Sequence, residues 1–147
     1  MTGRRHSSPF RKILVGYDGS KPADKALDVA LHLAQADDAE LLVVAVARPP
    51  EPPTRVETIG VLENAQEHFE QDFKRIAARA RDLEVEVQTA ILVGHPIEQL
   101  VHRAETDRAD LIVLGRRGVS RFERMLLGST SEKVLRYAHC PVMIVPG

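Results

Sequence analysis

Hydrophobic residues gather along the chain in short runs, which are separated by longer segments of helical periodicity. Three runs are apolar without alternation, which is typical of strands buried on both faces of a parallel sheet: KILVGY (12–17), ELLVVAVA (40–47) and DLIVLG (110–115). LEVEVQTAIL (83–92) alternates apolar and polar residues at its start, which predicts a strand with one exposed face at an edge of the sheet. PVMIVPG (141–147) predicts a closing strand, also at an edge.

The segments between these runs place apolar residues three and four positions apart, which indicates amphipathic helices. The first helix starts near Pro22, a residue that suits a first helical turn, and its apolar stripe is Ala23, Ala26, Leu27, Ala30, Leu31 and Ala34. The longest helix starts at about Val61, a third follows the turn at residues 94–96, and a fourth spans residues 129–137. RPPEPPTRVETIG (48–60) holds four of the nine prolines and predicts a surface loop.

Strands that alternate with helices imply right-handed crossover connections and a parallel sheet covered on both faces. The sequence therefore predicts a doubly wound α/β domain with five strands, over residues 11–147, preceded by a disordered tail at residues 1–10. In such sheets ligands bind outside the carboxyl ends of the strands, where the strand order reverses. The loops after Tyr17, Ala47, Leu92 and Leu114 are the candidates for a site.

Composition narrows the possible partners. The 147 residues carry a formal net charge of -1, so the chain lacks the positive excess that nucleic-acid binding usually shows. The single cysteine, Cys140, allows no internal disulfide, and no apolar run is long enough to cross a bilayer. We therefore expect a cytoplasmic protein, with neither nucleic acid nor a membrane as its partner.

The loop after the fourth predicted strand carries Gly115, Gly118 and Gly128, followed by Ser129 and Thr130 at the start of the last helix. Glycines let a ligand approach peptide N–H groups, and a helix start adds free donors and partial positive charge, so the segment suits phosphate. A structural alternative stays open, in which the glycines end a strand and form a turn, and Ser129 with Glu132 forms a capping box. The spacing matches neither G-x-x-x-x-G-K-[ST] nor G-x-G-x-x-G.

The motifs KILVGYDGS, GHPIEQLV, ADLIVLGRRG and LLGSTSEKVLRYAHCPVMIVP resemble the universal stress protein family over residues 12–146. The resemblance implies a Rossmann-like fold of the adenine nucleotide alpha hydrolase type. In that family the pattern G-x2-G-x9-G-[ST], which stands here from Gly115 to Ser129, marks the members that bind ATP. Many relatives dimerise through the last strand, so a homodimer through Pro141 to Pro146 is expected.

Carried over by position, the resemblance implies that Gly115, Gly118, Gly128 and Ser129 hold the phosphates of ATP, with Thr130 as a second hydroxyl and Mg²⁺ (or Mn²⁺) bridging them. It also implies that Asp18 meets the nucleoside and that Gly16 and Val46 line the adenine. A carboxylate offers two acceptor oxygens to ribose hydroxyls, although an Asx turn within DGS also explains Asp18. Arg117 can reach a phosphate or close over the site, while Arg116 can point to solvent.

No arrangement for catalysis stands out in the sequence. The six histidines lack metal-ligand spacing, the expected role of His95 is to cap the helix that follows, and Cys140 suits packing better than nucleophilic attack. Three functions remain. The first is an ATP-binding stress-response module that regulates a dimer or partner surface, the second is a slow ATP hydrolase, and the third is a structural dimer that takes no nucleotide.

Overall fold

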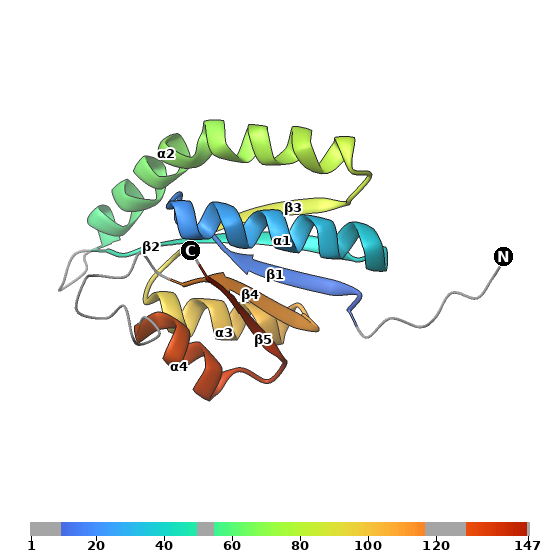
Figure 1. Ribbon diagram of the computed structural model, residues 1–147. Coiled ribbons are helices and arrows are strands. Elements are labelled where there is room, and N and C mark those ends of the chain that lie inside the picture. The colour runs from blue at the N-terminus through green and yellow to red at the C-terminus, as the bar shows by residue number, and fades with distance from the viewer. Residues whose placement is uncertain (1–9, 50–54, 117–128, 147) are drawn as a thin grey trace, which may run out of the picture.

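The computed structural model describes residues 10–49, 55–116 and 129–146. Its five strands form one parallel sheet in the order β3-β2-β1-β4-β5, which confirms the predicted doubly wound α/β class (Figure 1). The strands are β1 (Lys12–Gly16), β2 (Glu40–Ala47), β3 (Val87–Val93), β4 (Leu111–Gly115) and β5 (Val142–Val145). The strands β3 and β5 lie at the two edges, as their sequences predict.

Four helices cover the sheet. They are α1 (Lys21–Asp37), α2 (Arg55–Asp82), α3 (Pro96–Thr106) and α4 (Ser129–Tyr137). In Figure 1, α1 and α2 lie on one face and α3 and α4 on the other. Among the described residues, no helix combines the length and the apolar composition that crossing a bilayer requires.

Strand alternation divides the core into two clusters. Ile13, Val15 and Tyr17 of β1 and its continuation pack towards α1 and α2, whereas Leu14 packs towards α3 and α4. All six residues of the predicted α1 stripe are buried. Because each fully buried valine or leucine side chain stabilises a fold by about 1.5–3 kcal/mol, these unbroken apolar runs account for the central strands.

Two predicted boundaries are wrong. The helix α2 begins at Arg55 instead of Val61, so residues 55–60 are helical although they were predicted as loop. Gly60 lies within this helix although glycine disfavours helix interiors, and a β-carbon at this position would have open space around it. The strand β3 begins at Val87 instead of Leu83, since Leu83 and Glu84 form the turn after α2 and Glu84 has a φ of 58°.

Candidate functional site

A pocket of about 140 Å³ opens at the carboxyl ends of β1, β2 and β4, beside the first turns of α1 and α3. This is where the strand order reverses between β1 and β4, the position at which open α/β sheets usually bind ligands. The pocket is lined by Gly16, Tyr17, Asp18, Ser20, Pro22, Ala23, Val44, Val46, Pro96, Leu100, Leu114 and Gly115.

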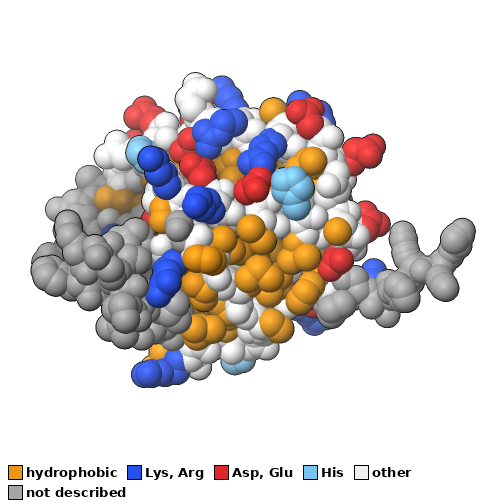
Figure 2. Space-filling model, in the orientation of Figure 1, with side chains coloured by type: hydrophobic (Ala, Val, Ile, Leu, Met, Phe, Trp, Pro, Cys, Tyr) orange, Lys and Arg blue, Asp and Glu red, His pale blue; other side chains and the backbone are white. Residues whose placement is uncertain are grey.

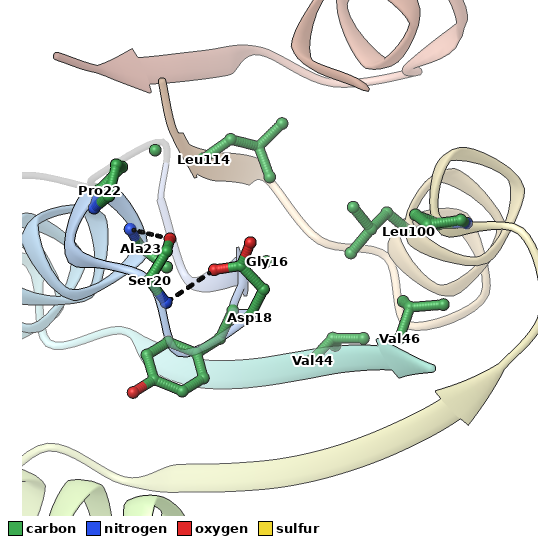
Figure 3. Close-up of a pocket in the computed structure, with 12 residues that line it drawn as sticks. Gly16, Asp18, Ser20, Pro22, Ala23, Val44, Val46, Leu100 and Leu114 are labelled. Carbon is green, nitrogen blue, oxygen red and sulfur yellow. Dashed lines mark hydrogen bonds between the residues drawn. The ribbon is translucent and has the colours of Figure 1, made fainter. Parts of the chain in front are cut away.

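The inner wall of the pocket is apolar. Figure 3 shows Val44 and Val46 of β2 on the same side of the pocket as Leu100, with Leu114 across the pocket from the two valines. A β-carbon added at Gly16 would lie 2.7 Å from Cδ2 of Leu114 and 3.4 Å from Cδ1 of Leu100. Glycine at this position therefore leaves room for the side chains of Leu114 and Leu100 to pack against the end of β1. The apolar part of the pocket, lined by these two leucines, Gly16, Val44 and Val46, is called the slot below and suits a flat apolar group.

The rim of the pocket is polar and belongs to the loop that leads into α1. The backbone N–H of Ser20 donates to Oδ1 of Asp18 at 2.9 Å, so the Asx turn considered for Asp18 is present (Figure 3). Oγ of Ser20 accepts from the backbone N–H of Ala23 at 3.2 Å and caps α1. A carboxylate has about four lone-pair sites, so it can accept more than one hydrogen bond.

Gly115 has a packing role that is independent of any ligand. A β-carbon there would lie 2.3 Å from the carbonyl oxygen of Pro22 and 2.9 Å from the backbone nitrogen of Ala23. The end of β4 therefore contacts the first turn of α1 backbone to backbone, and no side chain fits between them. This contact forms one wall of the pocket.

The structure places four of the residues expected from the sequence, namely Gly16, Asp18, Val46 and Gly115, around this one pocket. Ser129 and Thr130 are the first two residues of α4. Arg117, Gly118 and Gly128 lie outside the described residues. Arg116 is partly buried, and its backbone N–H donates to the carbonyl oxygen of Val145 at 2.8 Å.

Several pocket residues were missed in the sequence. Pro96 and Leu100 lie in the GHPIEQL segment after β3, where the topology already pointed to a ligand-bearing loop. Val44 shares a strand face with Val46 because it is two residues away. His95 stands at the N-cap position of α3, but its side chain makes no capping hydrogen bond, so its predicted capping role is wrong.

Other candidate chemistry is not assembled in the described part of the chain. No group of three or more His, Cys, Asp or Glu side chains there is arranged to hold a metal ion. Cys140 is partly buried against the core cluster on the α3 and α4 face. Burial, followed by the negative charge of Asp110, raises the pKa of the Cys140 thiol, which opposes formation of a nucleophilic thiolate.

Together the fold and the pocket define an α/β protein with a candidate ligand site at the switch point of a parallel sheet. The universal stress protein family matches residues 9–146, and the chain belongs to this family. It is 34% identical over 145 residues to a universal stress protein of Methanocaldococcus jannaschii, with 97% of this chain and 85% of the relative covered. It is 33% identical to one of Bacillus subtilis, with 92% and 99% covered.

Solved structures agree with this family membership. A universal stress protein family member from Burkholderia pseudomallei has a TM-score of 0.77 at 30% identity, covering 95% of this chain and 98% of that chain. A universal stress protein solved in complex with cAMP has a TM-score of 0.75 at 28% identity, covering 94% and 98%. The second of these relatives thus holds an adenine nucleotide.

Proposed function

We propose that this protein is an ATP-binding universal stress protein, which acts in the cytoplasm as a nucleotide-dependent module of the stress response. The observation that carries the proposal is the pocket itself, which combines an apolar slot at Gly16 and Val46 with the carboxylate of Asp18 at its rim. The relative in complex with cAMP supports an adenine nucleotide as the ligand class.

Each part of the ligand matches a different part of the site. The adenine ring would enter the slot beside Gly16 and Val46, because its faces are apolar and flat. The ribose hydroxyls would donate to Asp18. The phosphates would lie towards Gly115 and the segment that follows it, where Arg117, Gly118, Gly128, Ser129 and Thr130 complete the proposed set.

The proposed metal ion, Mg²⁺ or Mn²⁺, would enter with the nucleotide. Mg²⁺ in nucleotide sites is usually bound through one or two carboxylates together with the phosphates of the ligand. Asp18 is the one Asp or Glu side chain among the described pocket residues. Most ligands of the metal ion would therefore be phosphate oxygens and waters. The ion would therefore follow the triphosphate rather than occupy a site of its own.

Calorimetry on nucleotide-stripped protein tests the proposal. Titration with ATP and Mg²⁺ should give saturable binding, and the Asp18→Asn variant should bind more weakly because it loses the negative charge that attracts ribose hydroxyls. This variant keeps an oxygen that accepts from Ser20, so the turn survives. The absence of both heat and thermal stabilisation with the wild-type protein would rule the ligand out, and an assay of released phosphate separates binding from slow hydrolysis.

We also propose a homodimer through β5. An edge strand offers unpaired backbone groups to a second chain, and charged or polar side chains usually discourage such pairing. The edge strand β3 exposes Gln88 and Thr89, whereas β5 consists of partly buried apolar residues only. Figure 2 shows apolar side chains gathered on the face where Figure 1 places β1, β4 and β5.

Size-exclusion chromatography with light scattering tests the dimer. We expect twice the mass of the 16.3 kDa chain for the wild-type protein and a monomer for Met143→Lys, which places a charge on β5. Thr89→Lys makes the same change on the opposite edge and should leave the dimer intact. A monomeric wild-type protein at micromolar concentration would contradict the proposal.

A further inference from the structure

The helix α2 lies close to the loop at the rim of the pocket. Gly19 has a φ of +83°, and a β-carbon there would lie 3.8 Å from Oδ2 of Asp72 and 3.9 Å from Cε1 of Phe69. The ring of Phe69 also meets the ring of Tyr17 edge to face, with centroids 6.2 Å apart. Tyr17 and Gly19 therefore lie against α2, and Asp18 between them lines the pocket.

The guanidinium group of Arg75 joins this loop to two helices. Its Nη2 donates to the hydroxyl of Tyr17 at 3.3 Å and lies 3.7 Å from Oδ1 of Asp24, and its Nη1 donates to Oδ1 of Asp72 at 3.2 Å. The Tyr17 hydroxyl in turn donates to Oδ1 of Asp24 at 3.1 Å. One arginine thus fixes the end of β1 against α1 and α2 together.

Tyr17 and Arg75 both keep their protons near neutral pH. Burial raises the pKa of Tyr17 and the hydrogen bond to Asp24 raises it further, although the hydrogen bond from Arg75 opposes both. The hydroxyl therefore stays protonated, donates to Asp24 and accepts from Arg75. The hydrogen bond to Tyr17 raises the pKa of Arg75 as well, so the guanidinium remains charged.

Tyr17 stands between two residues of the pocket. Tyr17 is 4% exposed and packs in the core cluster of the α1 and α2 face, and together with its neighbours Gly16 and Asp18 it also lines the pocket. A shift of the Tyr17 ring would therefore move the backbone that carries the Asp18 carboxylate. We propose that Arg75 is a positioning residue for nucleotide binding, which holds Tyr17 in place and thereby orients Asp18 towards the ribose hydroxyls.

This inference rests on the proposed function, and the structure offers a matched control for it. Arg79 lies one helical turn after Arg75 on α2 and forms an ion pair with Asp28 of α1, which lies one turn after Asp24. Both arginines link α2 to α1, and their side chains are similarly exposed, at 44% for Arg79 and 58% for Arg75. Arg75 alone of the two donates to Tyr17 in the described hydrogen bonds.

The test compares ATP with 2′,3′-dideoxy-ATP, which lacks both ribose hydroxyls, by calorimetry on the full chain. A hydrogen bond to a carboxylate is worth about 1.5–3 kcal/mol, so the wild-type protein should prefer ATP by about tenfold or more. Arg75→Ala should remove most of this preference by weakening ATP binding while dideoxy-ATP binding changes less than about twofold. Arg79→Ala should keep the preference for ATP, and Arg75→Lys should keep more of it than Arg75→Ala does.

Tyr17→Phe provides a second route, because it removes the hydroxyl that accepts from Arg75 and donates to Asp24, and it should lose the same preference. Equal weakening of both nucleotides by Arg75→Ala, or an unchanged preference, would overturn the inference and leave the proposed function in place. Equal affinity of the wild-type protein for the two nucleotides would also overturn it. A wild-type protein that binds neither nucleotide would overturn the proposed function and the inference together.

Discussion

The last residue of β4, Gly115, contacts the carbonyl group of Pro22 so closely that a β-carbon on the glycine would lie 2.3 Å from the carbonyl oxygen. These residues are far apart in the sequence, and their contact joins the end of the central sheet to the first turn of α1. The pocket lies directly beside this junction. Packing of the fold and the shape of the site thus depend on the same glycine.

Gly115→Ala should destabilise the protein by about 1–3 kcal/mol, because the new methyl group meets rigid backbone atoms. Gly16→Ala is the contrasting variant, since its methyl group meets the end of the Leu114 side chain, which can rotate away. We expect Gly16→Ala to cost less stability but to narrow the slot and weaken ATP binding. Urea unfolding and calorimetry measure the two effects, and a Gly115→Ala protein as stable as the wild type would contradict this account.

His95→Ser should stabilise the protein by about 0.5–1 kcal/mol. His95 already has the extended backbone of an N-cap residue, with φ -82° and ψ 124°, but its side chain makes no capping bond. A serine would supply the missing acceptor, and Glu98 stands at the position that completes a capping box. Thermal unfolding measures the gain, and Ser20→Ala, which removes the existing cap of α1, should show a loss of about 1 kcal/mol as the control.

Gly60→Ala should stabilise α2 by about 0.5–1 kcal/mol, because glycine in a helix loses more conformational entropy on folding than alanine. The substitution meets no obstacle among the described residues, since no atom beyond the chain neighbours of Gly60 and the nearby backbone of α2 lies within 4 Å of the added β-carbon. Chemical denaturation should show a higher midpoint with an unchanged slope. A lower midpoint would indicate that residues 55–60 are not helical in solution.

Cys140 should make the free energy of unfolding depend on pH in the alkaline range. Burial raises the pKa of its thiol above the ordinary value of 9.0, so the native state holds this proton more tightly than the unfolded state does. The resulting stabilisation is fully present below pH 9.0 and is lost as the pH rises through the native pKa. Cys140→Ala removes this dependence.

The measurement is urea unfolding of both proteins between about pH 7 and pH 10.5, with the difference in free energy of unfolding plotted against pH. Tyr17 has a pKa raised in the same direction, but it remains in both proteins and cancels in the difference. The wild-type protein should lose stability relative to Cys140→Ala above pH 9.0. A difference that stays constant with pH would show that the thiol titrates alike in both states.

Most of the fold follows from local sequence patterns. The apolar runs of β1, β2 and β4, the α1 stripe and the edge positions of β3 and β5 were all predicted, because burial on one or two faces leaves a periodic signal. The start of α2 was not predicted, since four prolines at residues 49–53 obscured the helix that begins at Arg55. The turn at Glu84 was missed because alternating residues also occur outside strands.

The candidate site was likewise predicted in part from the sequence. Gly16, Asp18, Val46 and Gly115 were named from the sequence, and the topology places them at one end of the sheet. Sequence alone left open whether Asp18 forms a turn and whether Gly115 has a packing role, because both depend on neighbouring atoms. Nothing in the sequence indicated a role for Arg75, because its hydrogen bond with Tyr17 joins residues that are 58 positions apart. Periodicity records which side chains are buried, whereas only the packed fold determines which distant side chains meet.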